Sequence, residues 1–145
     1  MLKIVCAAFL LCVAGCASAV ASAGNASCAW DGGAWATEWD AGPNGQAGAA
    51  PVTLEILPDG AVRGRWGETD APSGLLWGRI AGPDGGAIIG EWGGAIADPV
   101  PPAGAFLFQR VAPTADAPSL CHFQGFYTYG DGVAPYRWNG ARAAE

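Results

Sequence analysis

The sequence predicts an all-β fold, specifically a small up-and-down antiparallel β-barrel of about eight strands. Short segments in which apolar and polar residues alternate are separated by turns rich in Gly, Pro and Asp, which is typical of antiparallel strands. After the N-terminal apolar run, no window has the 3.6-residue period of a useful helix. A third observation is a recurring motif in which an apolar residue, a glycine and an aromatic residue follow one another two positions apart. It occurs at Val62-Gly64-Trp66, Ile88-Gly90-Trp92 and Phe123-Gly125-Tyr127.

The expected strands follow one another along the chain with one apolar face each. The first places Trp35, Thr37 and Trp39 on one face, since residues two apart share a face of a strand. Pro58-Asp59-Gly60 and Pro83-Asp84-Gly85-Gly86 have the composition of turns, and Pro99, Pro101 and Pro102 are assigned to a loop. The eight strands are expected around residues 35–39, 52–56, 62–66, 76–80, 88–92, 106–108, 123–127 and 136–140.

The glycines inside the strands favour closure of the sheet. A glycine in mid-strand lowers stability unless another group occupies the space of its missing side chain. We expect a Trp or Phe from a neighbouring strand to lie over each such glycine, where the bare backbone also permits the strong coiling of a small barrel. An eight-stranded barrel is therefore expected, and a two-sheet sandwich is the alternative.

The N-terminus has the features of an export signal. Lys3 precedes about ten apolar residues, which suits a secretory signal but is too short for a membrane-spanning helix of roughly 20 residues. The segment Val13-Ala14-Gly15-Cys16 resembles the lipobox of bacterial lipoproteins, in which the chain is cut before a cysteine that then carries acyl chains. We therefore expect a signal peptide at residues 1–15, lipidation of Cys16, a flexible tether at 16–30 and the barrel domain at 31–145. The alternative is ordinary secretion after cleavage at Ala21-Ser22-Ala23.

The remaining cysteines predict one disulfide bond. Either cleavage leaves Cys28 and Cys121, and an even pair in an exported chain favours a disulfide. Metal binding is the rival interpretation. However, the only histidine, His122, adjoins Cys121, and adjacent strand residues point to opposite faces. No metal site and no cofactor are expected.

Charge and motif content exclude several function classes. Lys3 is the only lysine among seven basic residues, so the chain without its leader has six arginines against thirteen acids. An acidic surface of this kind does not suit nucleic acid. The chain lacks a Gly-x-Ser-x-Gly elbow and a phosphate-binding loop. A carboxylate pair such as Glu38 and Asp40 is the one catalytic option that the sequence leaves open, and we expect no enzyme.

Taken together, the motifs resemble those of a group of exported bacterial proteins that are expected to be small antiparallel barrels. The most specific element is the terminal Trp138-Asn139-Gly140-x-Arg142, and Gly33-x-Trp35 and Gly104-x-Phe106-x-Phe108 extend the likeness over nearly the whole mature chain. The pattern is more distantly similar to avidin-like and lipocalin-like barrels. The resemblance implies the fold and carries no activity.

Three residues are candidates for binding. Trp138 and the other inward tryptophans (Trp35, Trp39, Trp66 and Trp92) are expected mainly to fill the barrel. Arg142 is expected beside Trp138, paired with Glu38, Asp40 or a stacked ring, either as a closing latch or as an anion site. Trp77 is expected to face outward, as are Ile89, Leu107 and Phe126, which we expect to be scattered.

These features predict a lipid-anchored, non-enzymatic protein of the bacterial cell envelope that binds a protein or a small ligand by a barrel domain. A purely structural envelope component and an inhibitor of periplasmic hydrolases are the alternatives, the second by analogy only. A soluble periplasmic or secreted protein is the alternative location.

Overall fold

Eight antiparallel strands form one closed barrel, as the sequence predicts. The computed structural model describes residues 28–31, 33–42, 47–68, 70, 72–94, 103–117, 120–130, 132 and 134–143. The expected signal peptide, Cys16, most of the tether and the Pro99–Pro102 loop lie outside these residues. No helix in the described part of the chain is long and apolar enough to cross a membrane. The strands are β1 (Ala34–Trp39), β2 (Gly48–Ile56), β3 (Ala61–Gly67), β4 (Pro72–Ala81), β5 (Ala87–Gly94), β6 (Gly104–Val111), β7 (Leu120–Tyr127) and β8 (Tyr136–Ala143).

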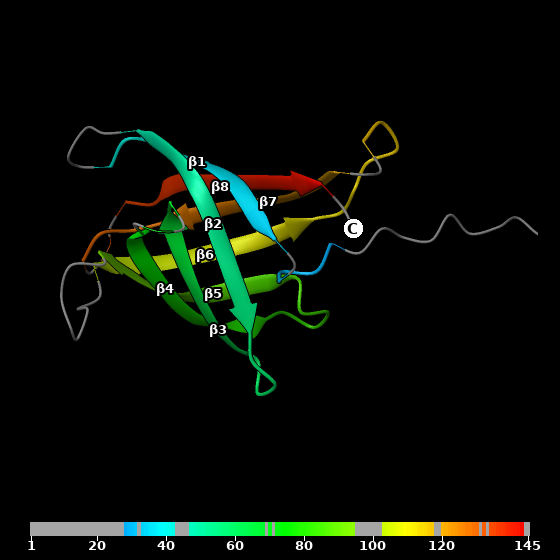
Figure 1. Cartoon of the computed structure of the whole chain (residues 1–145), viewed down its shortest axis with the longest axis horizontal. Coiled ribbons are helices and arrows are strands. Elements are labelled where there is room, and N and C mark those ends of the chain that lie inside the picture. The colour runs from blue at the N-terminus through cyan, green and yellow to red at the C-terminus, as the bar shows by residue number, and fades with distance from the viewer. Residues whose placement is uncertain are drawn as a thin grey trace, which may run out of the picture.

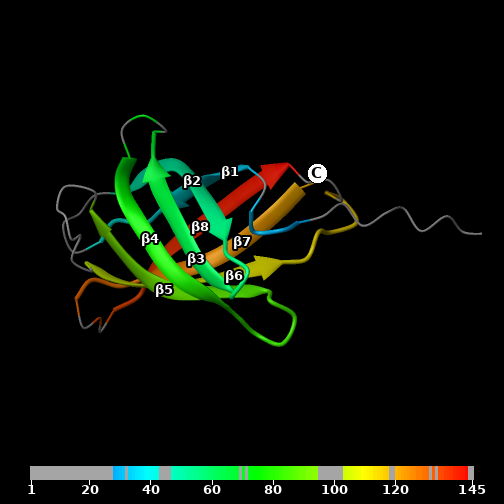
Figure 2. The ribbon, with the colours of Figure 1, turned by 60° about the horizontal axis from the view of Figure 1, so that its bottom comes forward.

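Each strand pairs with the next, and β8 closes the barrel by pairing with β1. The closing register places Ala36 opposite Ala141 and Trp39 opposite Trp138. Figures 1 and 2 show β1 and β8 side by side, with the start of the described chain and the C-terminus at the same end of the barrel. Closure leaves the sheet without free edges.

The barrel interior is filled by aromatic and aliphatic side chains from alternate strand positions. Phe108 and Phe123 stack with ring centroids 4.4 Å apart, and Phe106 lies 4.6 Å from Phe108. Trp35 and Phe108 have no exposed surface. This packing agrees with the expectation that an eight-stranded barrel is just wide enough for its own side chains.

Aromatic rings lie over glycines, as the recurring motif of an apolar residue, a glycine and an aromatic residue predicts. A Cβ built on Gly125 would lie 2.6 Å from Cδ1 of Phe108, and one on Gly90 would lie 2.9 Å from Cε1 of Phe106. At Gly64 the prediction of a ring is wrong, because Leu54 fills that space, with Cδ2 at 2.8 Å. In all three cases a glycine lies beside a large side chain from a neighbouring strand, which occupies the space that a Cβ would need.

The N-terminal segment of the described chain is fastened to one end of the barrel. Cys28 and Cys121 form the expected disulfide, with Cα atoms 5.5 Å apart and a sequence separation of 93 residues. A loop of that length corresponds to about 4–5 kcal/mol in the chain-entropy model. Trp30 falls inside the expected tether of residues 16–30, yet it is only 3% exposed and belongs to the core. The disulfide holds this segment against the barrel, so the described residues from Cys28 onward belong to the packed domain.

Replacing Gly125 by alanine tests the contact between ring and backbone. The new Cβ would meet Phe108 and the backbone oxygen of Trp138, both at 2.6 Å, and the backbone cannot give way easily. We expect Gly125→Ala to lower the free energy of unfolding by about 1–3 kcal/mol in urea denaturation. Gly94→Ala is the matched control, because no described atom lies within 4 Å of its Cβ position. Equal stability of the two variants would contradict this account of barrel closure.

Candidate functional site

The two ends of the barrel differ, and one of them is plugged. Trp30 covers this end and donates through Nε1 to the backbone oxygen of Gly85 at 3.0 Å. Trp35 donates to the oxygen of Trp30 at 3.0 Å, and Arg110 donates to the oxygen of Cys28 at 2.9 Å. The side chains of the barrel thus satisfy the backbone of the plugging segment, which is what a buried chain terminus needs.

Arg142 belongs to this plug. It is 8% exposed, and its Nη2 donates to the backbone oxygens of Ala29 and Asp31. Its guanidinium carbon lies 4.9 Å from the ring centroid of Trp35. The stacked ring that the sequence allowed as a partner is therefore confirmed, while Asp40 pairs with Arg137 instead. The latch interpretation of Arg142 fits these contacts, since its two hydrogen bonds join the last strand to the plug and its contact with Trp35 joins the last strand to the first.

Among the described residues, nothing closes the opposite end, and aromatic rings line it. We call this end the aromatic mouth and define it by six residues that surround one pocket of about 40 Å³: Trp39, Trp66, Trp92, Tyr127, Tyr129 and Trp138. Trp39, Trp66 and Tyr129 are only partly buried, whereas the other three lie deeper. The pocket accepts a small chemical group and no more.

The rings of the mouth stand nearly perpendicular to one another. Trp66 makes an angle of 72° with Trp39 and 89° with Trp138. On the other wall, Trp92 makes 79° with Tyr127 and 85° with Tyr129. Edge-to-face packing is the preferred geometry of aromatic pairs, and it presents ring faces to the pocket from several directions.

Hydrogen bonds fix three of the six rings. Trp138 donates through Nε1 to Oγ1 of Thr37 at 3.0 Å, and Thr37 itself donates to the oxygen of Ala50 at 2.7 Å. Trp92 donates to the oxygen of Thr128 at 3.0 Å, and the hydroxyl of Tyr127 donates to the oxygen of Asp40 at 2.8 Å. The deep rings are therefore held in place without any ligand.

Backbone features position the two outer tryptophans. The β3–β4 register shifts between Trp66 and Gly67, where Gly67 has a positive φ of 104°, and such irregularities at barrel rims re-aim side chains. Trp66 lies over Gly74, with its Nε1 2.2 Å from the position of a Cβ there, and that nitrogen has no partner among the described residues. Trp39 lies over Gly48 in the same way.

Three acidic residues, Asp40, Glu68 and Asp70, are described in the connections at the mouth end, and no lysine or arginine is described there. Glu68 and Asp70 are exposed. Arg137 at the start of β8 is held by Asp40, with Nε 2.8 Å from the carboxylate. The plugged end, by contrast, holds Arg110 and Arg142.

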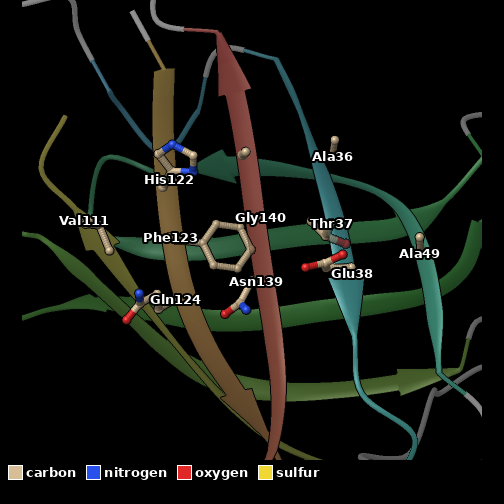
Figure 3. Close-up of a pocket in the computed structure, with 11 residues that line it drawn as sticks. Ala36, Thr37, Glu38, Ala49, Val111, His122, Phe123, Gln124, Asn139 and Gly140 are labelled. Atoms are coloured by element: carbon tan, nitrogen blue, oxygen red, sulfur yellow. The ribbon is translucent and has the colours of Figure 1, made fainter. Parts of the chain in front are cut away.

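A larger hollow lies on the outside of the barrel. It is a groove of about 580 Å³ across β7, β8, β1 and β2, lined by small residues such as Ala36 and Ala49 and by the polar side chains of His122, Gln124 and Glu38 (Figure 3). Asn139 projects here, but its Oδ1 accepts from the backbone nitrogen of Gly125 at 3.3 Å. The groove is wide and shallow.

Trp77 lies on the outer surface, as predicted, and donates to Oε2 of Glu91 at 2.9 Å. The expectation that the other outer apolar residues are scattered is wrong. Ile89 pairs with Leu107, and Leu107 pairs with Phe126, so the three lie side by side, since directly paired strand residues are neighbours on one face. Leu107 and Phe126 are 39% and 47% exposed.

The three candidates from the sequence therefore occupy three different places. Only Trp138 lines the mouth, while Arg142 is in the plug and Trp77 is on the outer wall. Trp39, Trp66 and Trp92 were assigned to the barrel filling, and Tyr129 was missed altogether. Its position two residues beyond Tyr127, on the same side of the chain, is the signal that points to it.

Comparison with known proteins adds no assignment: no protein-family model and no curated protein matches this chain.

The pKa of the Tyr127 hydroxyl gives a test of how deeply this ring of the mouth is buried. Burial, followed by the nearby Tyr129, Tyr136 and Asp40, raises its pKa from 10.0 to about 12. Between these pH values the unfolded chain loses the Tyr127 proton while the folded protein keeps it. The free energy of unfolding should therefore fall as pH rises from about 10 to 12. Urea denaturation over this range, and the ring-carbon resonances of Tyr127 in NMR spectra, measure the two effects.

Tyr127→Phe is the control for this titration. It removes one hydrogen bond and should cost about 1 kcal/mol at neutral pH. It should also remove the part of the loss in unfolding free energy between pH 10 and 12 that comes from ionisation of Tyr127. A Tyr127 resonance that titrates near 10 would contradict the buried geometry.

Proposed function

We propose that this protein is an exported, non-enzymatic binding module of the bacterial cell envelope, tethered to a membrane through Cys16, which holds a small group of its ligand in the aromatic mouth. The observation that carries the proposal is the mouth itself, in which six rings surround one open pocket. Ligand sites are typically concave and mainly apolar, with few polar groups. A ligand enters only in part, because about 40 Å³ is available.

The position of the mouth suits a tethered protein. The chain enters the barrel at Cys28, on the plugged end, and the mouth is at the other end. Eleven residues separate Cys16 from Cys28, so their Cα atoms can be at most about 40 Å apart. An anchor at Cys16 would therefore hold the plugged end toward the membrane and leave the mouth free to face outward.

The anchor is tested by fractionation of cells that express the full chain. Cys16→Ser should move the protein from the membrane fraction to the soluble fraction, because acylation needs the thiol of that cysteine. Cys12→Ser is the matched control in the same leader and should leave the distribution unchanged. If Cys16→Ser has no effect on partitioning, the lipid anchor is wrong and cleavage near Ala23 takes its place.

Binding at the mouth is tested by NMR titration of the exported protein with small probes of four kinds: a methylated ammonium ion, a neutral sugar, a neutral branched alcohol and a carboxylate. At least one probe should shift the indole N–H resonances of Trp39 and Trp66. The resonances of Trp30, in the plug, and Trp77, on the outer wall, serve as internal controls. If none of the four shifts Trp39 and Trp66, the mouth is part of the core and not a site.

A further inference from the structure

We infer that the ligand group held by the aromatic mouth is an organic cation of the methylated ammonium type. This inference rests on the proposed function and narrows it to one chemical class. Its basis is the combination of ring faces, pocket size and charge at one end of the barrel.

The ring geometry favours a positive charge. The face of an aromatic ring is the negative side of its quadrupole, and a cation within about 6 Å of the ring centroid is attracted to it, most strongly by tryptophan. The mouth contains four tryptophans and two tyrosines. Trp39, Trp66 and Trp138 all line the pocket and stand at 65–89° to one another, so their ring faces are turned in different directions.

Three of the six rings of the mouth have no donor left for a ligand, which disfavours a ligand that depends on many hydrogen bonds. The donors of Trp92, Trp138 and Tyr127 are already used within the protein. The Nε1 edge of Trp66 lies over the backbone of Gly74. A sugar needs partners for each hydroxyl that it buries, whereas a methylated ammonium group has no strong donor to satisfy. Its size also matches a pocket that admits one compact group.

Charge around the mouth acts in the same direction. Glu68 and Asp70, in the β3–β4 connection that follows Trp66, are exposed acids, and Arg137 is paired with Asp40. No described cationic side chain lines the pocket. The field therefore attracts a cation and opposes a carboxylate or phosphate. Arg110 and Arg142, which could serve an anion, lie at the plugged end.

The decisive experiment compares choline with 3,3-dimethylbutan-1-ol, its uncharged carbon isostere, by titration of the exported protein and detection of tryptophan fluorescence. The two probes have the same shape, so burial of surface contributes equally. We expect choline to bind about tenfold more tightly, the factor given by roughly 1.4 kcal/mol of cation–π attraction. Equal binding of the two would overturn the inference while leaving the mouth as a site.

Variants test whether the rings themselves provide the attraction. Trp39→Leu and Trp66→Leu keep an apolar side chain and remove the π system, so each should weaken choline binding about tenfold and change binding of the neutral isostere much less. Trp77→Leu, on the outer wall, should change neither, and circular dichroism checks that each variant is folded. A loss that is the same for both probes would indicate simple packing and would overturn the inference.

Two sources could supply such a cation, a lipid headgroup or a free metabolite. Sedimentation with phosphatidylcholine vesicles, compared with phosphatidylglycerol vesicles, separates them, using a form with Cys16→Ser so that no lipid anchor contributes. Binding of free choline together with pelleting on phosphatidylcholine supports a headgroup. Binding of choline without pelleting supports a free ligand, and failure of choline in both assays overturns the inference, while the other three probes still decide the proposed function.

Discussion

The structure depends on aromatic rings seated against bare backbone. Gly125 under Phe108 and Gly90 under Phe106 let a large ring approach a neighbouring strand where any Cβ would collide with it. Glycine alone would weaken these strands, and the rings alone would not fit inside eight strands. Together they fill the interior and allow the sheet to coil until β8 meets β1.

The packing of rings over glycines finishes differently at the two ends of the barrel. At one end the chain adds Trp30, which the disulfide and Arg142 hold over the core. At the other end no residue of the described chain plays this part, so the last layer of rings is partly open. Trp39 and Trp66 still lie over Gly48 and Gly74, which means that the mouth continues the packing of rings over glycines found in the core.

The fold could be predicted from the sequence, because its cause is local. Residues two apart share a face, so Ile88-Gly90-Trp92 already shows where a ring and a gap will meet. The disulfide could be predicted by counting the cysteines of a chain that is expected to be exported. The site could not be predicted in this way, since Trp39, Trp92 and Trp138 have the same local pattern as Trp35, and only the three-dimensional structure shows that Trp35 lies under a plug while the others face an opening. The row from Ile89 to Phe126 likewise depends on register between strands.

A solid interior has a consequence for recognition. A lipid-binding barrel encloses its ligand, and its selectivity comes from the shape of a deep cavity. Here the rings occupy that space, so under the proposed function only the terminal group of a ligand would enter the mouth, and the remainder would stay outside the barrel. Selectivity would then depend on the negative faces of the rings and on the exposed acids Glu68 and Asp70. The charge of the ligand group would therefore matter more than its shape. Because the deep rings are already fixed by hydrogen bonds, little ordering is needed on binding, which reduces the entropic cost of association.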